Sequence, residues 1–216
     1  MYKTLVVIFA VFMIGCGRGD DSNGGESTDP DPKARALARR SEGISPEFLE
    51  GLVAKMEQDY PPTGHNTWAL VDDLLSVGDR PSPAVFEKRL RQVVLKALRV
   101  KAENIFGIVC IGRDPPGTDD LKFVLTNRTG RNVAGVNGVI QVRTKFGNTI
   151  ESLKLSADKP IAPGGELACG GHWSLPSALM EQLASGDGRY ELKFVAAKVT
   201  FGDGTVEQFP GIVAGE

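Results

Sequence analysis

The sequence has few of the residues that enzymes use most for catalysis and metal binding. Only two histidines, His65 and His172, and three cysteines occur in 216 residues. A nucleophilic triad needs a histidine held between an acid and a serine or cysteine, and no Gly-x-Ser-x-Gly segment is present. The two histidines also lie too far apart in the chain for the close spacing typical of a zinc site. We therefore expect no enzyme activity, no metal and no cofactor.

Charge of one sign and long apolar runs are lacking as well. With 25 basic against 27 acidic residues, the net charge of −2 gives no electrostatic reason to expect nucleic acid as a partner. The one long apolar run covers residues 5–14. As a helix it would measure about 15 Å, half of the ~30 Å hydrocarbon core of a membrane. A multi-span membrane protein is therefore excluded.

This short apolar run has the features of an export signal. Lys3 precedes it, and its last two residues begin the segment Met-Ile-Gly-Cys at positions 13–16. The four residues resemble the lipobox of bacterial lipoproteins. The resemblance implies a signal peptide over residues 1–15, a diacylglyceryl lipid on Cys16 and attachment to a membrane of the bacterial cell envelope. Two alternatives stay open: a signal peptide cleaved elsewhere, with Cys16 incidental, and an uncleaved N-terminal anchor helix.

The residue after the predicted lipid site bears on which membrane is chosen. Gly17 is not acidic. By similarity to the sorting rules of enteric lipoproteins, this favours the outer membrane or a periplasm-facing site.

The remaining chain changes character three times. Residues 17–33 contain no aliphatic or aromatic side chain, so residues 16–43 are expected to form a flexible polar tether. Residues 44–104 show helical spacing, with Ser-Pro pairs at 45–46 and 82–83 as start signals. Residues 105–210 show the two-residue period of strands, and residues 211–216 are a tail.

The strand pattern predicts an antiparallel sandwich of about seven short strands. Leu121, Phe123 and Leu125 alternate with polar residues, and a short helix is expected at 177–185. The apolar positions change parity near Ala196 and Ala197, which predicts a β-bulge there.

The fold class is thus α+β, with an N-terminal helical region followed by an antiparallel β-sandwich. Three segments of the second part carry a family resemblance: the strand-loop-strand start at 121–142, the Pro-Ile-Ala-Pro-Gly-Gly corner at 160–165 and the hairpin at 199–205. In these segments the second part resembles immunoglobulin-like domains of bacterial envelope proteins, including the FxLYD type. The resemblance implies a binding or spacer module.

Two cysteines remain once Cys16 is assigned to lipid. Cys110 and Cys169 both lie in expected strands. In an exported chain they are predicted either to form one disulfide or to be two separately buried small hydrophobic residues.

These observations favour a membrane-anchored, non-enzymatic binding or scaffolding module that engages an unknown protein or polymer. The alternative is an enzyme or accessory subunit with a site between helices and sandwich near His172. A third hypothesis is a purely structural spacer of the envelope.

Overall fold

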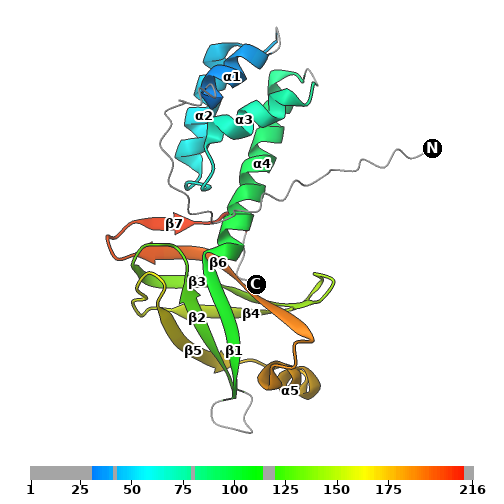
Figure 1. Cartoon of the computed structure of the whole chain (residues 1–216), viewed down its shortest axis with the longest axis vertical. Coiled ribbons are helices and arrows are strands. Elements are labelled where there is room, and N and C mark those ends of the chain that lie inside the picture. The colour runs from blue at the N-terminus through cyan, green and yellow to red at the C-terminus, as the bar shows by residue number, and fades with distance from the viewer. Residues whose placement is uncertain (1–30, 41–42, 79–80, 114–119, 212–216) are drawn as a thin grey trace, which may run out of the picture. The chain divides into compact units, whose positions relative to one another are not determined.

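The computed structural model describes residues 31–40, 43–78, 81–113 and 120–211. Helices come first in this part of the chain and two antiparallel sheets follow (Figure 1). The predicted signal peptide, Cys16, positions 17–30 of the expected tether and positions 212–216 of the expected tail lie outside the described residues. None of the described helices combines the length and the apolar character needed to cross a membrane.

Four helices precede the first strand within the described residues. Their apolar sides form one core, in which the side chains of Leu49, Met56, Leu90 and Leu98 are at most 1% exposed. The helices are α1 (Pro32–Arg39), α2 (Pro46–Asp59), α3 (Thr67–Ser76) and α4 (Pro83–Asn104).

Local capping explains where these helices begin. The Ser45 hydroxyl accepts a hydrogen bond from the Phe48 N–H at 3.2 Å, and a proline follows the serine at the first helical position. The Asn66 side chain accepts from the Trp68 N–H at 2.8 Å. Ser82 precedes the proline that opens α4, although its side chain makes no capping bond. The starts predicted from the two Ser-Pro pairs are confirmed.

Helix α1 was not predicted, because it lies within residues 16–43, where a flexible tether was expected. An eight-residue helix is marginal in water by itself, so tertiary contacts decide its formation. The carboxylate of Asp72 in α3, only 6% exposed, pairs with the guanidinium groups of Arg35 at 2.9 Å and Arg39 at 3.1 Å. Ala36 of α1 is fully buried. Residues 32–39 of the expected tether are therefore helical.

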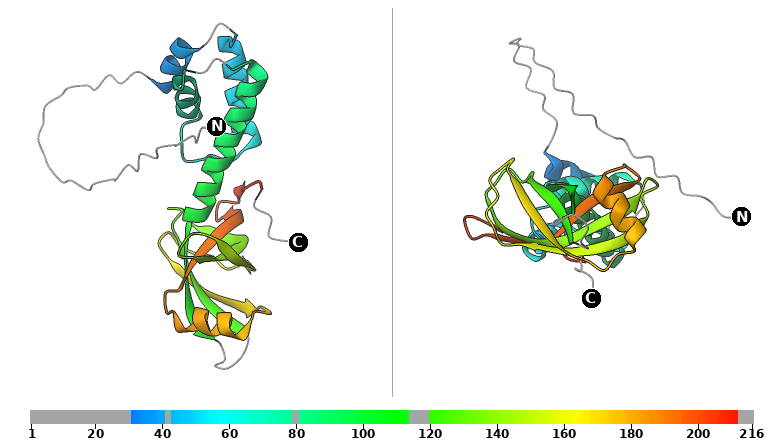
Figure 2. Two further views of the ribbon diagram at one scale, coloured as in Figure 1. Left: turned by 90° about the vertical axis from the view of Figure 1, so that its right-hand side faces the viewer. Right: turned by 90° about the horizontal axis from the view of Figure 1, so that it is seen from below.

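The strands form two sheets that face each other (Figure 2). One has three strands in the order β1-β2-β5, and the other has four in the order β4-β3-β6-β7. The α+β class, with helices followed by packed antiparallel sheets, is confirmed. The elements are β1 (Phe106–Arg113), β2 (Asp120–Asn127), β3 (Val133–Thr144), β4 (Thr149–Ala157), β5 (Glu166–His172), α5 (Ser177–Ser185), β6 (Tyr190–Phe201) and β7 (Val206–Gln208).

The predicted details of the strand region are confirmed. Leu121, Phe123 and Leu125 are buried and alternate with half-buried residues along β2. In the β3–β6 pair, Asn137 lies opposite Lys198 but Gly138 lies opposite Ala196, so Ala197 is the additional residue of a bulge. The short helix spans the predicted residues 177–185.

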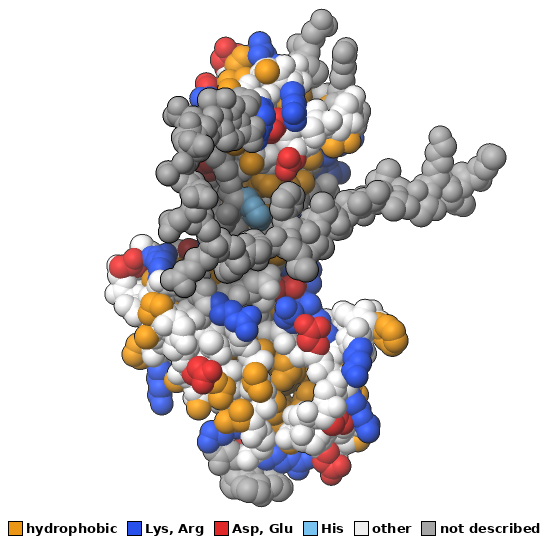
Figure 3. Space-filling view, in the orientation of Figure 1, with side chains coloured by type: hydrophobic (Ala, Val, Ile, Leu, Met, Phe, Trp, Pro, Cys, Tyr) orange, Lys and Arg blue, Asp and Glu red, His pale blue; other side chains and the backbone are white. Residues whose placement is uncertain are grey.

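The outer face of the three-stranded sheet is partly apolar. Hydrophobic side chains gather over β1 and β2 in the space-filling view (Figure 3). Val109 and Ile111 of β1 are 60% and 52% exposed. Exposed apolar residues on an edge strand are common in single positions, and these two lie away from the α4 end of β1.

The helical region continues into the sandwich without a linker. Helix α4 ends at Asn104 and β1 begins at Phe106, whose ring packs edge-on against Phe194 with 5.7 Å between centroids. Arg143 of β3 also pairs with Glu103 of α4 at 2.9 Å. The last turn of α4 is therefore held on the sandwich by apolar packing and an ion pair.

Candidate functional site

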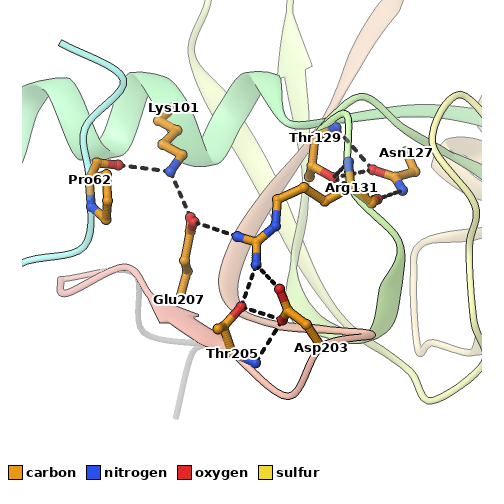
Figure 4. A network of polar contacts seen from close by, with 8 residues as sticks. All are labelled: Pro62, Lys101, Asn127, Thr129, Arg131, Asp203, Thr205 and Glu207. Atoms are coloured by element: carbon orange, nitrogen blue, oxygen red, sulfur yellow. Dashed lines mark hydrogen bonds and ion pairs between the residues drawn. The ribbon is translucent and has the colours of Figure 1, made fainter.

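A network of polar side chains joins the loop between α2 and α3 to the sandwich (Figure 4). The Lys101 ammonium of α4 donates to the carbonyl of Pro62 at 2.7 Å and pairs with the Glu207 carboxylate of β7 at 2.6 Å. Glu207 also lies 3.6 Å from a guanidinium nitrogen of Arg131. Lys101 is 20% and Glu207 14% exposed at the side chain. One lysine thus fixes the α2–α3 loop relative to the last strand.

Arg131 extends the network to the turn between β6 and β7. Its guanidinium lies 3.7 Å from the centroid of the Phe201 ring and pairs with the Asp203 carboxylate at 2.7 Å. The hydroxyl and the backbone N–H of Thr205 donate to Asp203, and together with Arg131 they lower the pKa of Asp203 to about 2. The turn therefore keeps its negative charge at any physiological pH.

Glu103 anchors the other side of the same helical turn. Burial alone would raise the pKa of its carboxyl, but hydrogen bonds and charge from Arg143 and Arg99 outweigh burial and lower that pKa. Lys101 and Glu103 thus hold α4 to two different strands, β7 and β3. The last turns of α4 are therefore attached to both strands, and Lys101 also holds the α2–α3 loop through the Pro62 carbonyl.

A cavity of about 550 Å³ lies beside this loop, within the size range of small-molecule sites. The buried side chains of Met56 and Val94 line it from α2 and α4. Two half-buried aromatic residues, Tyr60 and Trp68, line it as well. We call this cavity the aromatic pocket. The other lining residues are Glu57, Pro61, Pro62, Thr63, His65, Asn66 and Thr67.

The loop that lines the aromatic pocket is fixed by its own hydrogen bonds. The buried Thr63 hydroxyl accepts from the N–H of His65 and donates to its carbonyl, both at 3.1 Å. Asn66 caps α3, and the Pro62 carbonyl is held by Lys101. A loop with these restraints gives a pocket that is largely formed before a ligand binds.

The structure places His172, the residue named for the alternative enzyme site, away from the N-terminal helices. His172 lies opposite Asp120, and its Nδ1 atom is 3.0 Å from that carboxylate. This pair lies at the end of β2 farthest from α4, because α4 leads to Phe106, which pairs with Asn127 at the other end. An eight-residue strand is about 25 Å long. The predicted site between helices and sandwich near His172 is therefore wrong.

Cys110 and Cys169 are free cysteines. Each pairs with Phe123, one from either side of β2. Two strand spacings place the backbones about 9.5 Å apart, beyond the roughly 7 Å that a disulfide spans. The second prediction for these residues, two separate small side chains, agrees with their half-buried positions. Cys16 lies outside the described residues.

We expect both thiols to react slowly in the folded protein and fully after unfolding. Burial raises the pKa of Cys110 and of Cys169, so at pH 8 less thiolate is present than in a free cysteine, and the thiolate is the reactive form. Titration of the Cys16→Ser chain with a chromogenic disulfide should count two thiols in denaturant without reductant. A count of zero would show that they form a disulfide.

Sequence analysis did not single out the aromatic pocket. It named His65 only as one of two histidines and gave no role to Tyr60 or Trp68. The available signal was the clustering of aromatic and polar residues around the Pro-Pro-Thr-Gly break at 61–64. Within the described part of the chain, no group of histidine, cysteine and acidic residues could hold a metal ion.

Comparison with known proteins gives no family for this chain. No protein-family model matches it, and no curated protein matches it either.

Proposed function

We propose that this protein is a lipid-anchored lipoprotein of the bacterial envelope that acts as a non-enzymatic binding or scaffolding module. The observation that carries the binding role is the aromatic pocket, whose walls are held in place by the Lys101 network. A preformed cavity beside a rigid joint suits ligand capture, because little ordering entropy is lost on binding.

The proposed anchor is the lipid on Cys16. In this proposal the polar residues that follow Cys16 serve as the tether. The outer membrane is the favoured location. We also propose that the sandwich belongs to the immunoglobulin-like class, and seven strands in two facing antiparallel sheets support this.

Metabolic labelling with a fatty-acid analogue tests the anchor. The wild-type chain, produced in a bacterial host, should incorporate the label and fractionate with membranes. Cys16→Ser should abolish labelling and release the protein, whereas Cys169→Ser is the matched control and should keep both properties. Unlabelled wild-type protein, or labelling that survives Cys16→Ser, would refute the anchor.

A further inference from the structure

We propose that the aromatic pocket binds the pyranose rings of a glycan, an inference that rests on the proposed binding function and names its ligand. The pocket brings together two kinds of surface that a sugar needs. Tyr60 and Trp68 offer flat apolar rings, and four polar side chains lie around the same cavity: Glu57, His65, Asn66 and Thr67. A pyranose ring matches both, because its C–H faces are apolar and its rim carries hydroxyl groups that donate and accept hydrogen bonds.

Four polar groups of the pocket are available to a ligand. Among the described residues, the carboxylate of Glu57, the hydroxyls of Tyr60 and Thr67 and the indole N–H of Trp68 make no hydrogen bond within the chain. The Lys33 ammonium lies 5.3 Å from the Trp68 ring centroid, and the ring also packs against the helical core. Donors and acceptors of several kinds are thus grouped in one place with their bonding capacity unused.

This grouping distinguishes a sugar from other ligands of the same size. A purely apolar ligand would cover these polar groups without pairing them, and each unpaired group costs free energy. A proline-rich peptide would use the two aromatic rings, but its backbone offers carbonyl acceptors and few donors, so the carboxylate of Glu57 would lack a partner. Sugar hydroxyls can donate to Glu57 and accept from Trp68.

The restraints on the loop support the same ligand class. Protein–sugar contacts depend on several hydrogen bonds formed together, so the side chains must already be in position. The loop between Tyr60 and Asn66 is fixed by the hydrogen bonds of Thr63 within the loop and by the bond from Lys101 of α4. The glycan could be a free oligosaccharide or a strand of the cell wall, and both present the same rings.

Tryptophan fluorescence gives a direct test. The chain has two tryptophans, and Trp173 packs against Phe123 in the sandwich, with ring centroids 5.5 Å apart. The full chain carries Trp173→Phe and is purified in detergent, so that the remaining fluorescence reports Trp68. A trimer of N-acetylglucosamine and a trimer of glucose are each titrated into it. Saturable quenching or a blue shift with either trimer is expected. Co-sedimentation with purified cell-wall sacculi distinguishes a polymer ligand from a free oligosaccharide.

Variants then locate the binding. Trp68→Ala and Glu57→Gln should each weaken binding by about tenfold. Binding to Trp68→Ala is measured by calorimetry, because this variant lacks the fluorescent side chain. Tyr60→Phe keeps the ring and should have a smaller effect. Glu181→Gln, at an exposed position of α5, is the matched control and should bind as the wild type does. Because Glu57 is exposed, its replacement leaves the fold intact even if Trp68→Ala unfolds.

Three results would overturn the proposal. The first is no saturable binding of either trimer or of sacculi. The second is binding that Glu57→Gln and Trp68→Ala leave unchanged. The third is displacement of the sugar signal by poly-L-proline at equal concentration, which would assign the pocket to a peptide. None of these results affects lipid labelling at Cys16, so the failure of the ligand class and the failure of the anchored module are distinguishable.

Discussion

Replacement of Asn127 by alanine is expected to lower the free energy of unfolding by about 3 kcal/mol. Asn127 is fully buried at the end of β2. Its amide group donates to the carbonyls of Arg131, Ile161 and Ala162 at 2.8, 2.9 and 3.1 Å. The side-chain carbonyl oxygen of Asn127 accepts from the N–H of Thr129 at 2.9 Å and from the Thr129 hydroxyl at 2.7 Å. Alanine would leave several buried polar groups unpaired at once.

Urea unfolding followed by far-UV circular dichroism measures this loss. Asn132→Ala is the matched control, because Asn132 lies in the same loop with an exposed side chain. Its effect should stay within about 0.5 kcal/mol. Equal effects of the two substitutions would show that the buried hydrogen bonds of Asn127 are not what stabilises this corner. Loss of Asn127 should also loosen Arg131, which follows in the same loop and reaches Glu207 in the Lys101 network.

Gly138→Ala is expected to destabilise the protein by about 2–3 kcal/mol or to prevent folding. Gly138 lies on β3 directly beside the bulge at Ala197. A methyl group there would lie 2.6 Å from Cζ of Phe194 and would overlap the carbonyl oxygen of Val195. The backbone of β6 cannot move aside as a flexible side chain can. The paired strands β3 and β6 would therefore have to separate.

Gly51→Ala is the matched control and should have the opposite sign. Gly51 lies inside α2, and a methyl group there meets no atom within 4 Å. Alanine restricts the unfolded chain and favours a helix, so stability should rise by roughly 0.5–1 kcal/mol. Thermal and urea unfolding of both variants tests the pair. If Gly138→Ala were neutral, the close approach of β6 to β3 at the bulge would be wrong.

Local patterns in the sequence were sufficient for most of the secondary structure. Ser45 followed by a proline predicted the start of α2 because capping depends on neighbours three residues apart. The change of parity at Ala196 and Ala197 predicted the bulge because side chains in a strand alternate between two faces. Helix α1 could not be predicted in this way, since its partner Asp72 lies 37 positions from Arg35.

The cysteines show the same limit in a different form. Once Cys16 is assigned to lipid, two cysteines remain in a chain predicted to be exported, which made a disulfide between Cys110 and Cys169 reasonable. Strand order decided against it, because β2 lies between β1 and β5. His172 likewise had no partner in its own neighbourhood of the sequence, and the antiparallel pairing of β5 with β2 placed it beside Asp120, far from the helices.

The sequence by itself determined the α+β class, the place where helices give way to strands and the caps and bulge within them, because periodicity and capping act over a few residues. Only the tertiary structure decided that Lys101 joins the α2–α3 loop to β7, that Tyr60 and Trp68 line one cavity, and that the two thiols stay apart. These features depend on which distant segments meet, and that follows from the packing of a whole core rather than from any short pattern.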